Sequence, residues 1–495
     1  MTSNEPASTK IFASDTKEIA NHGQQNKESS SSEDNLDAES LAKTENSQVF
    51  EVSKEGPNFR GVGMYGAAIL IAKSQLGLGV LGLPSTLNAL GFLPGLLSLT
   101  CLCLLSTYTG LIIGKFRNKH PHIYCIDDAA YMLFGSVARE VMGWGFWLFY
   151  TLCYGSALLT ISIAFNSITE HAVCTVIWVV VGAVVSFILG ASIRTMRVLS
   201  FMGYFAMSSI LLAVWIVAIA CLTQKVPAAA PEGEPINKMI RVAASGARFN
   251  TVASAIAIQF FSLCGTASFF SIQAEMRDPK QYGRSLLMGQ ALVMFNYIVL
   301  AIMIYAKIGQ YVASPALGSA GVLLKKIAYG IALPGLFWSS FFTAHLAAKY
   351  ALIRILRGTK HLQSNTKIHW ITWLGMIAIV SAAGFIIAGA IPFFNNLVAL
   401  TGALVGTSFT LFIPACLTLY ELGHHKHHER DSTLTWIKHS WGELHHHKFT
   451  VVLSIFCICV AFFICVGGLY GAISSTVEAY ANGTVDRAFS CANNA

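Results

Sequence analysis

Eleven long apolar blocks, separated by short polar connections, constrain this 495-residue chain more than any other feature. Each block is about 20 residues or longer, the length that a helix needs to cross roughly 30 Å of hydrocarbon. Backbone groups in lipid must pair with one another, so such blocks are expected to be helices. The sequence therefore predicts an all-α, polytopic membrane protein. The blocks are 62–90, 92–114, 141–168, 172–190, 198–222, 250–272, 285–306, 331–353, 369–390, 393–420 and 449–474.

Composition excludes a soluble chain of this length. Apolar residues make up 54% and charged residues 12%, against about 25% charged residues in soluble domains. Residues 1–58 carry 5 Lys and 11 Asp or Glu, whereas residues 59–495 carry a net charge of +14. Because this positive charge lies in the loops between blocks, it is a topology signal, and no nucleic-acid partner is expected.

The blocks divide the chain into five regions. Residues 1–58 are polar and predict a disordered cytoplasmic tail that could recruit regulatory partners. Residues 59–420 form a ten-helix core, within which 121–138 is expected to be a short interfacial helix. A His-rich cytoplasmic loop, 421–448, precedes the eleventh helix at 449–474, and 475–495 form an extracellular tail.

Lys and Arg predict the orientation in the lipid bilayer. With the N-terminus inside, the inner loops hold 18 basic residues and the outer segments hold 8. The sequon that begins at Asn482 then falls outside, where it could be glycosylated. Cys174 and Cys491 would both lie near the outer face, and the sequence leaves open whether they pair.

Two blocks have interrupted helical patterns. The first contains Gly77, Gly79, Gly82 and Pro84, which cost about 1 kcal/mol per Gly and 3 per Pro in a helix. The sixth block, 250–272, gathers Gly and hydroxyl residues between aromatics. Glycines could instead form a face for close helix packing. However, two interrupted helices at matching positions in two halves point to the central site of a transporter. The unwound ends offer dipoles of both signs, which suits a zwitterion.

Several motifs carry a family resemblance. These motifs are the stretch from Lys73 to Pro84 and the segments 106–110, 275–279 and 390–394. In them the chain resembles amino acid/auxin permeases, and most of all the fungal neutral amino acid permeases of the methyltryptophan-resistance type. The resemblance runs from about residue 60 to 475. It implies a LeuT-like core of five plus five inverted helices, with broken first and sixth helices and an amino acid as substrate.

The resemblance also implies roles for residues at both breaks. The amides of Leu78 and Gly79, beside Gly77, would face the substrate carboxylate. Carbonyls around Phe261, Ser262 and Cys264 would receive its ammonium group, with Phe261 as an aromatic lid. Small residues such as Gly265, Ala267 and Ser268 would leave room for a larger substrate side chain.

The coupling ion is expected to be a proton, with no other cofactor. Val80 stands where sodium-coupled relatives of this fold often carry Asn, and an apolar side chain cannot coordinate sodium. Lys73 could replace a second sodium, although it could also snorkel to the surface. His345, two residues after Thr343, titrates near neutral pH, although it could equally be a hydrogen-bonded core histidine. These residues favour proton-driven import of neutral aliphatic or aromatic amino acids.

Three other functions compete with this prediction. The acidic tail would suit an amino acid sensor built on a transporter fold. The eight histidines of 421–448 could bind metal, yet the membrane blocks lack the paired ligands that a metal path requires. An enzyme is not expected, because Asp127 and Asp128 have no metal-ligand pattern around them. The plasma membrane is the favoured location, with the vacuolar membrane as the alternative.

Overall fold

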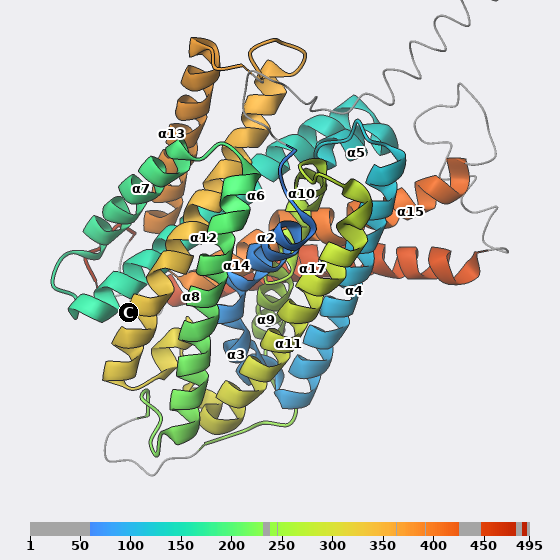
Figure 1. The fold of residues 1–495 in the computed structure, drawn as a ribbon. Coiled ribbons are helices and arrows are strands. Elements are labelled where there is room, and N and C mark those ends of the chain that lie inside the picture. Colours follow the sequence, from blue (N-terminus) through green and yellow to red (C-terminus); the bar gives the residue numbers. More distant parts are fainter. Residues whose placement is uncertain are drawn as a thin grey trace, which may run out of the picture. The chain divides into compact units, whose positions relative to one another are not determined.

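The computed structural model describes residues 60–230, 238–244, 246–362, 364–391, 393–424, 447–481 and 488–492. Its helices belong to one compact unit and are drawn in Figure 1. They are α2 (Met64–Leu76), α3 (Gly79–Leu90), α4 (Phe92–Lys119), α5 (Ile126–Phe134), α6 (Ser136–Thr169), α7 (Thr175–Ser192), α8 (Met196–Thr223), α9 (Phe249–Phe261), α10 (Phe269–Ala274), α11 (Tyr282–Ile308), α12 (Val322–Leu356), α13 (Lys367–Ala390), α14 (Phe394–Thr401), α15 (Ile413–His424) and α17 (Lys448–Ala481).

The predicted number of membrane crossings is confirmed for the described residues. Nine helical stretches are long and apolar enough to span a bilayer, and two further spans are bent pairs. The first pair, α2 and α3, bends by 44°, and the second, α9 with the segment Cys264–Ala274, bends by 41°. These are the two blocks in which the sequence predicts a break. The expected short helix in 121–138 is α5.

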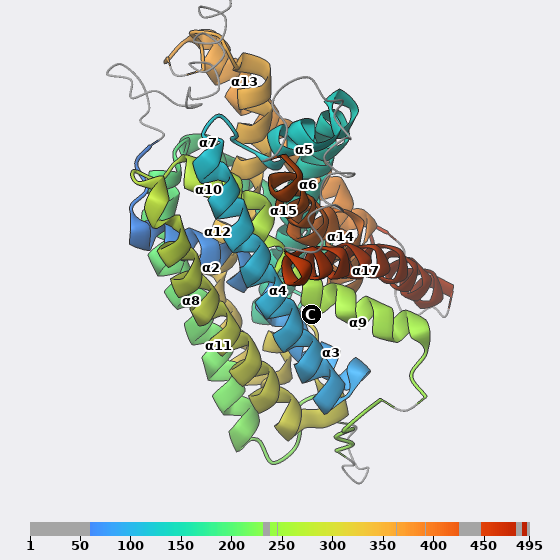
Figure 2. The same cartoon turned by 90° about the vertical axis from the view of Figure 1, so that its right-hand side faces the viewer.

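The two halves of the core pack in matching ways, as an inverted repeat requires. The third crossing, α6, packs against α13, and its counterpart five crossings later, α12, packs against α7. Likewise the first crossing packs against the fifth through α2 and α8. The sixth packs against the tenth through α9 and the π-helical turn Gly402–Gly406. The eleventh crossing, α17, lies along α9 outside this symmetry (Figure 2).

Local sequence accounts for the start of the short turn Pro279–Gln281, which leads directly into α11. Asp278 accepts a hydrogen bond from the Lys280 amide at 3.1 Å, and Pro279 occupies the first position of the short turn Pro279–Gln281. A side-chain cap followed by proline is a strong helix-start signal. The Asp-Pro pair of the 275–279 motif therefore reverses the chain between the sixth and seventh crossings.

Candidate functional site

The breaks of the first and sixth helices lie against each other. A Cβ added to Gly79 would lie 2.6 Å from the Ser262 Cα, and one added to Gly265 would lie 2.3 Å from the Ser74 Oγ. The Ser262 hydroxyl also donates to the Gly79 carbonyl at 3.0 Å. Since any side chain at either glycine would push the two segments apart, the glycines are required for this crossing.

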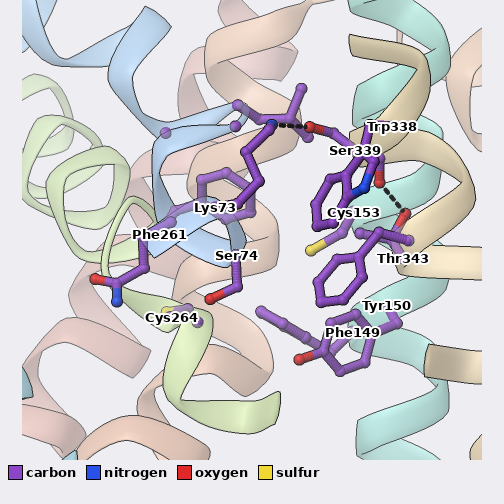
Figure 3. Close-up of a pocket in the computed structure, with 16 residues that line it drawn as sticks. Lys73, Ser74, Phe149, Tyr150, Cys153, Phe261, Cys264, Trp338, Ser339 and Thr343 are labelled. Atoms are coloured by element: carbon purple, nitrogen blue, oxygen red, sulfur yellow. Dashed lines mark hydrogen bonds between the residues drawn. The ribbon is translucent and has the colours of Figure 1, made fainter. Parts of the chain in front are cut away.

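A cavity of about 40 Å³ lies beside the crossing (Figure 3). This is room for a few water molecules. Its walls come from both breaks, from α6 and from α12. The lining residues are Lys73, Ser74, Gln75, Gly77, Leu78, Gly79, Phe149, Tyr150, Cys153, Phe261, Cys264, Gly265, Trp338, Ser339, Phe342 and Thr343.

The cavity gathers seven of the nine residues proposed for substrate or ion binding. Ser262 and His345 do not line it. The Ser262 carbonyl accepts a hydrogen bond from the Tyr297 hydroxyl at 2.8 Å. Of the small residues expected to leave space for a substrate side chain, Gly265 lines the cavity, whereas Ala267 and Ser268 are buried elsewhere.

Sequence reasoning missed the wall formed by the third crossing. Phe149, Tyr150 and Cys153 of α6 line the cavity, and Figure 3 shows Phe149 and Tyr150 below the Lys73–Ser339 pair. The block 141–168 contains no break or charge that would have singled these residues out. The one signal available was that Tyr150 and Cys153 follow Phe149 by one and four residues, a spacing that places all three side chains on one face of a helix.

Among the described residues that line the cavity, Lys73 is the single charged one, and only 1% of it is exposed. Its ammonium donates to the Ser339 hydroxyl at 2.7 Å and to the Gly335 carbonyl at 3.3 Å, both on α12. It also lies 5.1 Å from the Trp338 ring. None of the described carboxylates forms an ion pair with it. Lys73 is therefore buried rather than extended to the surface, and it joins the first crossing to the eighth.

The helix break adds further positive potential beside this ammonium. A Cβ on Gly77 would lie 3.3 Å from the Lys73 Nζ, so the cation sits against the break itself. The first amides of α3 have no acceptor within that helix, and one of them, the Leu81 amide, donates to the carbonyl of Leu78, which precedes the helix, at 3.2 Å. A free amide end and a buried ammonium together favour an anionic group.

His345 lies away from the cavity. Its Nδ1 is 3.0 Å from the Ile193 carbonyl, and its ring packs edge-on against Trp373 at 5.3 Å. Its Nε2 is buried with no hydrogen-bond partner among the described residues. Thr343, by contrast, lines the cavity and donates to the Ser339 carbonyl at 3.0 Å. The two neighbours on α12 thus face different surroundings.

A buried ion pair joins the sixth crossing to the eighth beyond the cavity. The Lys349 ammonium on α12 contacts the carboxylate of Glu275, which follows α10, and neither side chain is more than 1% exposed. The same carboxylate lies 3.4 Å from the Tyr124 hydroxyl and 3.4 Å from the Met196 amide. The pair therefore connects four separate segments at the end of the core where the chain enters α2.

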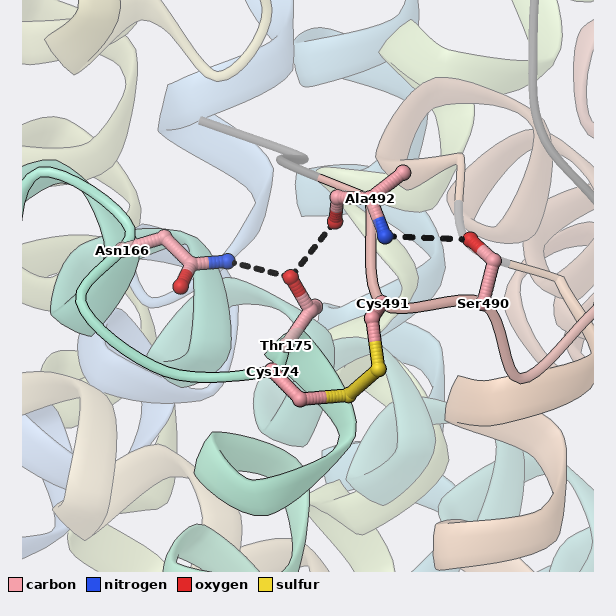
Figure 4. The surroundings of a disulfide bond; sticks show 6 residues. All are labelled: Asn166, Cys174, Thr175, Ser490, Cys491 and Ala492. Carbon is pink, nitrogen blue, oxygen red and sulfur yellow. Dashed lines mark hydrogen bonds between the residues drawn. A yellow bond between two sulfur atoms is a disulfide. The ribbon is translucent and has the colours of Figure 1, made fainter.

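At the opposite end, Cys174 and Cys491 form a disulfide (Figure 4). The Thr175 hydroxyl donates to the Ala492 carbonyl at 2.6 Å and accepts from the Asn166 side-chain amide at 2.7 Å. This answers the pairing question that the sequence left open. The segment after α17 is thereby attached to the loop between α6 and α7.

Three predictions concern residues outside the described part of the chain. They are the tail 1–58, the sequon at Asn482 and most of the loop 421–448, including its histidines between 425 and 446. Within the ranges that the structure describes, no group of three or more His, Cys, Asp or Glu side chains is placed to hold a metal ion.

Two broken helices that meet at a cavity inside an inverted repeat define a secondary transporter of the LeuT-like fold. Solved structures agree with this class. A structure of MhsT in complex with L-phenylalanine matches 83% of this chain and all of its own, with a TM-score of 0.54 and 13% identity. The nucleobase-cation-symport-1 family transporter Mhp1, closed with bromovinylhydantoin bound, matches 89% of this chain and 98% of its own, with a TM-score of 0.52 and 14% identity.

The chain belongs to the transmembrane amino acid transporter protein family, whose model matches residues 60–474. A "Transmembrane transporter" of Fusarium pseudograminearum is 32% identical over 92% of each chain. The "N amino acid transport system protein" of Neurospora crassa is 29% identical over 89% of this chain and 91% of its own. The predicted family and fold class are confirmed, and the protein is a membrane transporter rather than an enzyme.

Proposed function

We propose that this protein imports neutral amino acids by proton symport. The observation that carries the proposal is the buried Lys73 ammonium at the break of the first helix, bonded to α12. The rest of the wall is uncharged and rich in aromatic rings, including Phe149, Phe261 and Phe342. Such a wall favours an uncharged substrate side chain, because a charged one would lose its hydration without gaining a partner.

The two breaks supply opposite dipoles for the common part of an amino acid. The substrate carboxylate would face the Leu78 and Gly79 amides at the start of α3, beside Gly77. Its ammonium would face carbonyls at the end of α9, around Phe261 and Cys264. Ser262 contributes less in this arrangement, because its carbonyl already accepts the Tyr297 hydroxyl. Phe261 would cover the bound substrate.

Lys73 is the proposed link between protonation and conformation. Protonated, it donates to Ser339 and Gly335 and so holds the first helix against α12. As a neutral amine it would keep the donors but lose the charge that strengthens these bonds. Loss of the proton would therefore loosen the junction between the moving break and α12. His345 remains the second candidate for proton handling, acting from outside the cavity.

Vesicle uptake tests the proposal. Purified protein in liposomes should accumulate a neutral amino acid when a proton gradient is imposed, and should ignore a sodium gradient. Lys73→Met should abolish the pH-driven component while leaving substrate exchange at equal pH measurable. Lys360→Met, which removes an exposed loop lysine, is the matched control. Accumulation that follows sodium and is indifferent to pH would refute proton coupling.

The proposed location is the plasma membrane, with the N-terminus in the cytoplasm and the C-terminus outside. The Lys and Arg bias supports this orientation, and so does the disulfide, since such bonds persist in oxidising compartments. Asn482 would then be accessible to glycosylation. Digestion with an N-glycosidase should shift the wild-type protein on a gel but not Asn482→Gln. An unshifted wild type would remove this support for an external C-terminus.

A further inference from the structure

An open groove of about 770 Å³ lies at the end of the core where the chain enters the first helix. The start of α2, the start of α8 and the turn after α10 form its walls. It is separate from the central cavity, with which it shares no lining residue. Its lining includes Arg197, Phe201 and Tyr204 of α8 and Arg277 after α10.

Two arginines give the groove its charge. Arg197 and Arg277 are both exposed, and neither forms an ion pair with a carboxylate in the described ranges. The nearest acidic neighbours in sequence are already engaged. Asp278 accepts from the Lys280 amide and the Gln281 side chain, and Glu275 is buried against Lys349. Two available guanidinium groups at one groove suit a phosphate, which arginine binds through paired N–H donors.

The apolar wall shows where this phosphate would come from. Phe201, Tyr204 and the adjacent Phe205 are 66%, 42% and 68% exposed, and they belong to α8, a membrane-spanning helix. Exposed aromatic side chains on such a helix face lipid. Arg197 sits at the first turn of that helix, the depth at which lipid headgroups meet protein and at which Tyr is enriched. The groove thus combines cations at headgroup level with an aromatic surface for acyl chains.

We propose that this groove binds the headgroup of an anionic phospholipid. The lipid phosphate would bridge Arg197 on α8 and Arg277 after α10, with its acyl chains along Phe201 and Phe205. Basic pockets of this kind between membrane helices recognise anionic headgroups.

The groove adjoins the junction between the inner ends of the two broken helices. The Val62 amide donates to the Glu275 carbonyl at 3.0 Å, and the Arg277 amide donates to the Val62 carbonyl at 2.9 Å. A lipid held by Arg277 and Arg197 fastens this junction to α8. The bound lipid therefore stabilises the arrangement seen here, in which the segment before α2 is paired with the segment after α10.

Native mass spectrometry of the full-length protein tests the site. Protein in detergent is titrated separately with phosphatidylserine, phosphatidylcholine and inorganic phosphate. Phosphatidylserine should bind in preference to phosphatidylcholine. Near a membrane surface each basic residue contributes about a fivefold gain in affinity, so Arg197→Gln with Arg277→Gln should lose about 25-fold. Arg241→Gln, at an exposed arginine outside the groove, should bind as the wild type does.

Single replacements Arg197→Lys and Arg277→Lys keep the charge and should lose only part of the affinity, which provides a test if the double variant fails to fold. Equal affinity of wild type and double variant would overturn the proposal. Inorganic phosphate that displaces phosphatidylserine at equal concentration would assign the groove to a free anion instead. A wild type without preference for phosphatidylserine would also overturn the proposal.

Discussion

The buried Glu275–Lys349 pair gives a prediction whose size follows from its surroundings. Removal of one partner leaves a charge buried at no more than 1% exposure, which costs about 3–5 kcal/mol. In Lys349→Met the Glu275 carboxylate keeps, among the described residues, the 3.4 Å contacts from Tyr124 and Met196, which are too long to replace the ammonium. Lys349→Met and Glu275→Gln should therefore each destabilise the protein severely.

The double variant Glu275→Gln with Lys349→Met should be more stable than either single variant. Neither partner's charge is left unpaired in the double variant, so its cost falls to about 2 kcal/mol or less, and the coupling between the two sites is at least about 4 kcal/mol. Thermal unfolding of the four purified proteins, followed by tryptophan fluorescence, measures this order.

The pair Lys119–Glu421 is a matched control, since its side chains are 52% and 22% exposed. Removal of either partner should cost less than about 1 kcal/mol. A double variant at Glu275 and Lys349 that melts below both single variants would refute the reasoning, because the two losses would then be additive.

Three further predictions concern separate parts of the molecule. Gly79→Ala should abolish uptake and cost about 1–3 kcal/mol, because its Cβ would meet the facing break at 2.6 Å, whereas Gly283→Ala meets nothing within 4 Å and should transport normally. Burial and the neighbouring Asp128 carboxylate raise the pKa of Asp127, in α5, from 3.8 to about 6. Between these pH values the folded state binds more protons than the unfolded state, so the melting temperature of the wild type should fall as the pH rises from about 4 to about 6. Asp127→Asn should flatten this slope, and parallel pH profiles of the two proteins would contradict the prediction. Cys174→Ser or Cys491→Ser should lower the free energy of unfolding by about 2–4 kcal/mol, and reductant should destabilise the wild type but neither variant.

The crossings and their breaks could be predicted because lipid leaves the backbone few alternatives. A run of about 20 apolar residues must be helical, and a Gly-rich interruption within one must line a cavity or meet a partner. Gly77, Gly79 and Gly265 are visible in the sequence for this reason, and the structure places all three at the cavity wall.

Side-chain direction at the site could not be predicted in the same way. Ser262 and Cys264 are two residues apart in one break, yet only Cys264 lines the cavity. His345 and Thr343 are likewise two apart on α12, which turns them about 200° from each other around the helix. Phe149 and Tyr150 carry no signal beyond their spacing, because aromatic residues are common in apolar blocks. Which faces meet depends on helix rotation, and a single sequence does not encode that in any local pattern.

The disulfide has a consequence for how the protein is made. Cys174 is synthesised before the fourth crossing, whereas Cys491 follows α17 and so emerges after every helix of the core. The bond can close only when the last segment has reached the same side of the membrane as the loop between α6 and α7. Its formation therefore requires that an even number of crossings has been inserted between the two cysteines. A chain with one helix between the two cysteines misinserted could not close this bond, and a cell's quality control could distinguish it by that chemistry alone.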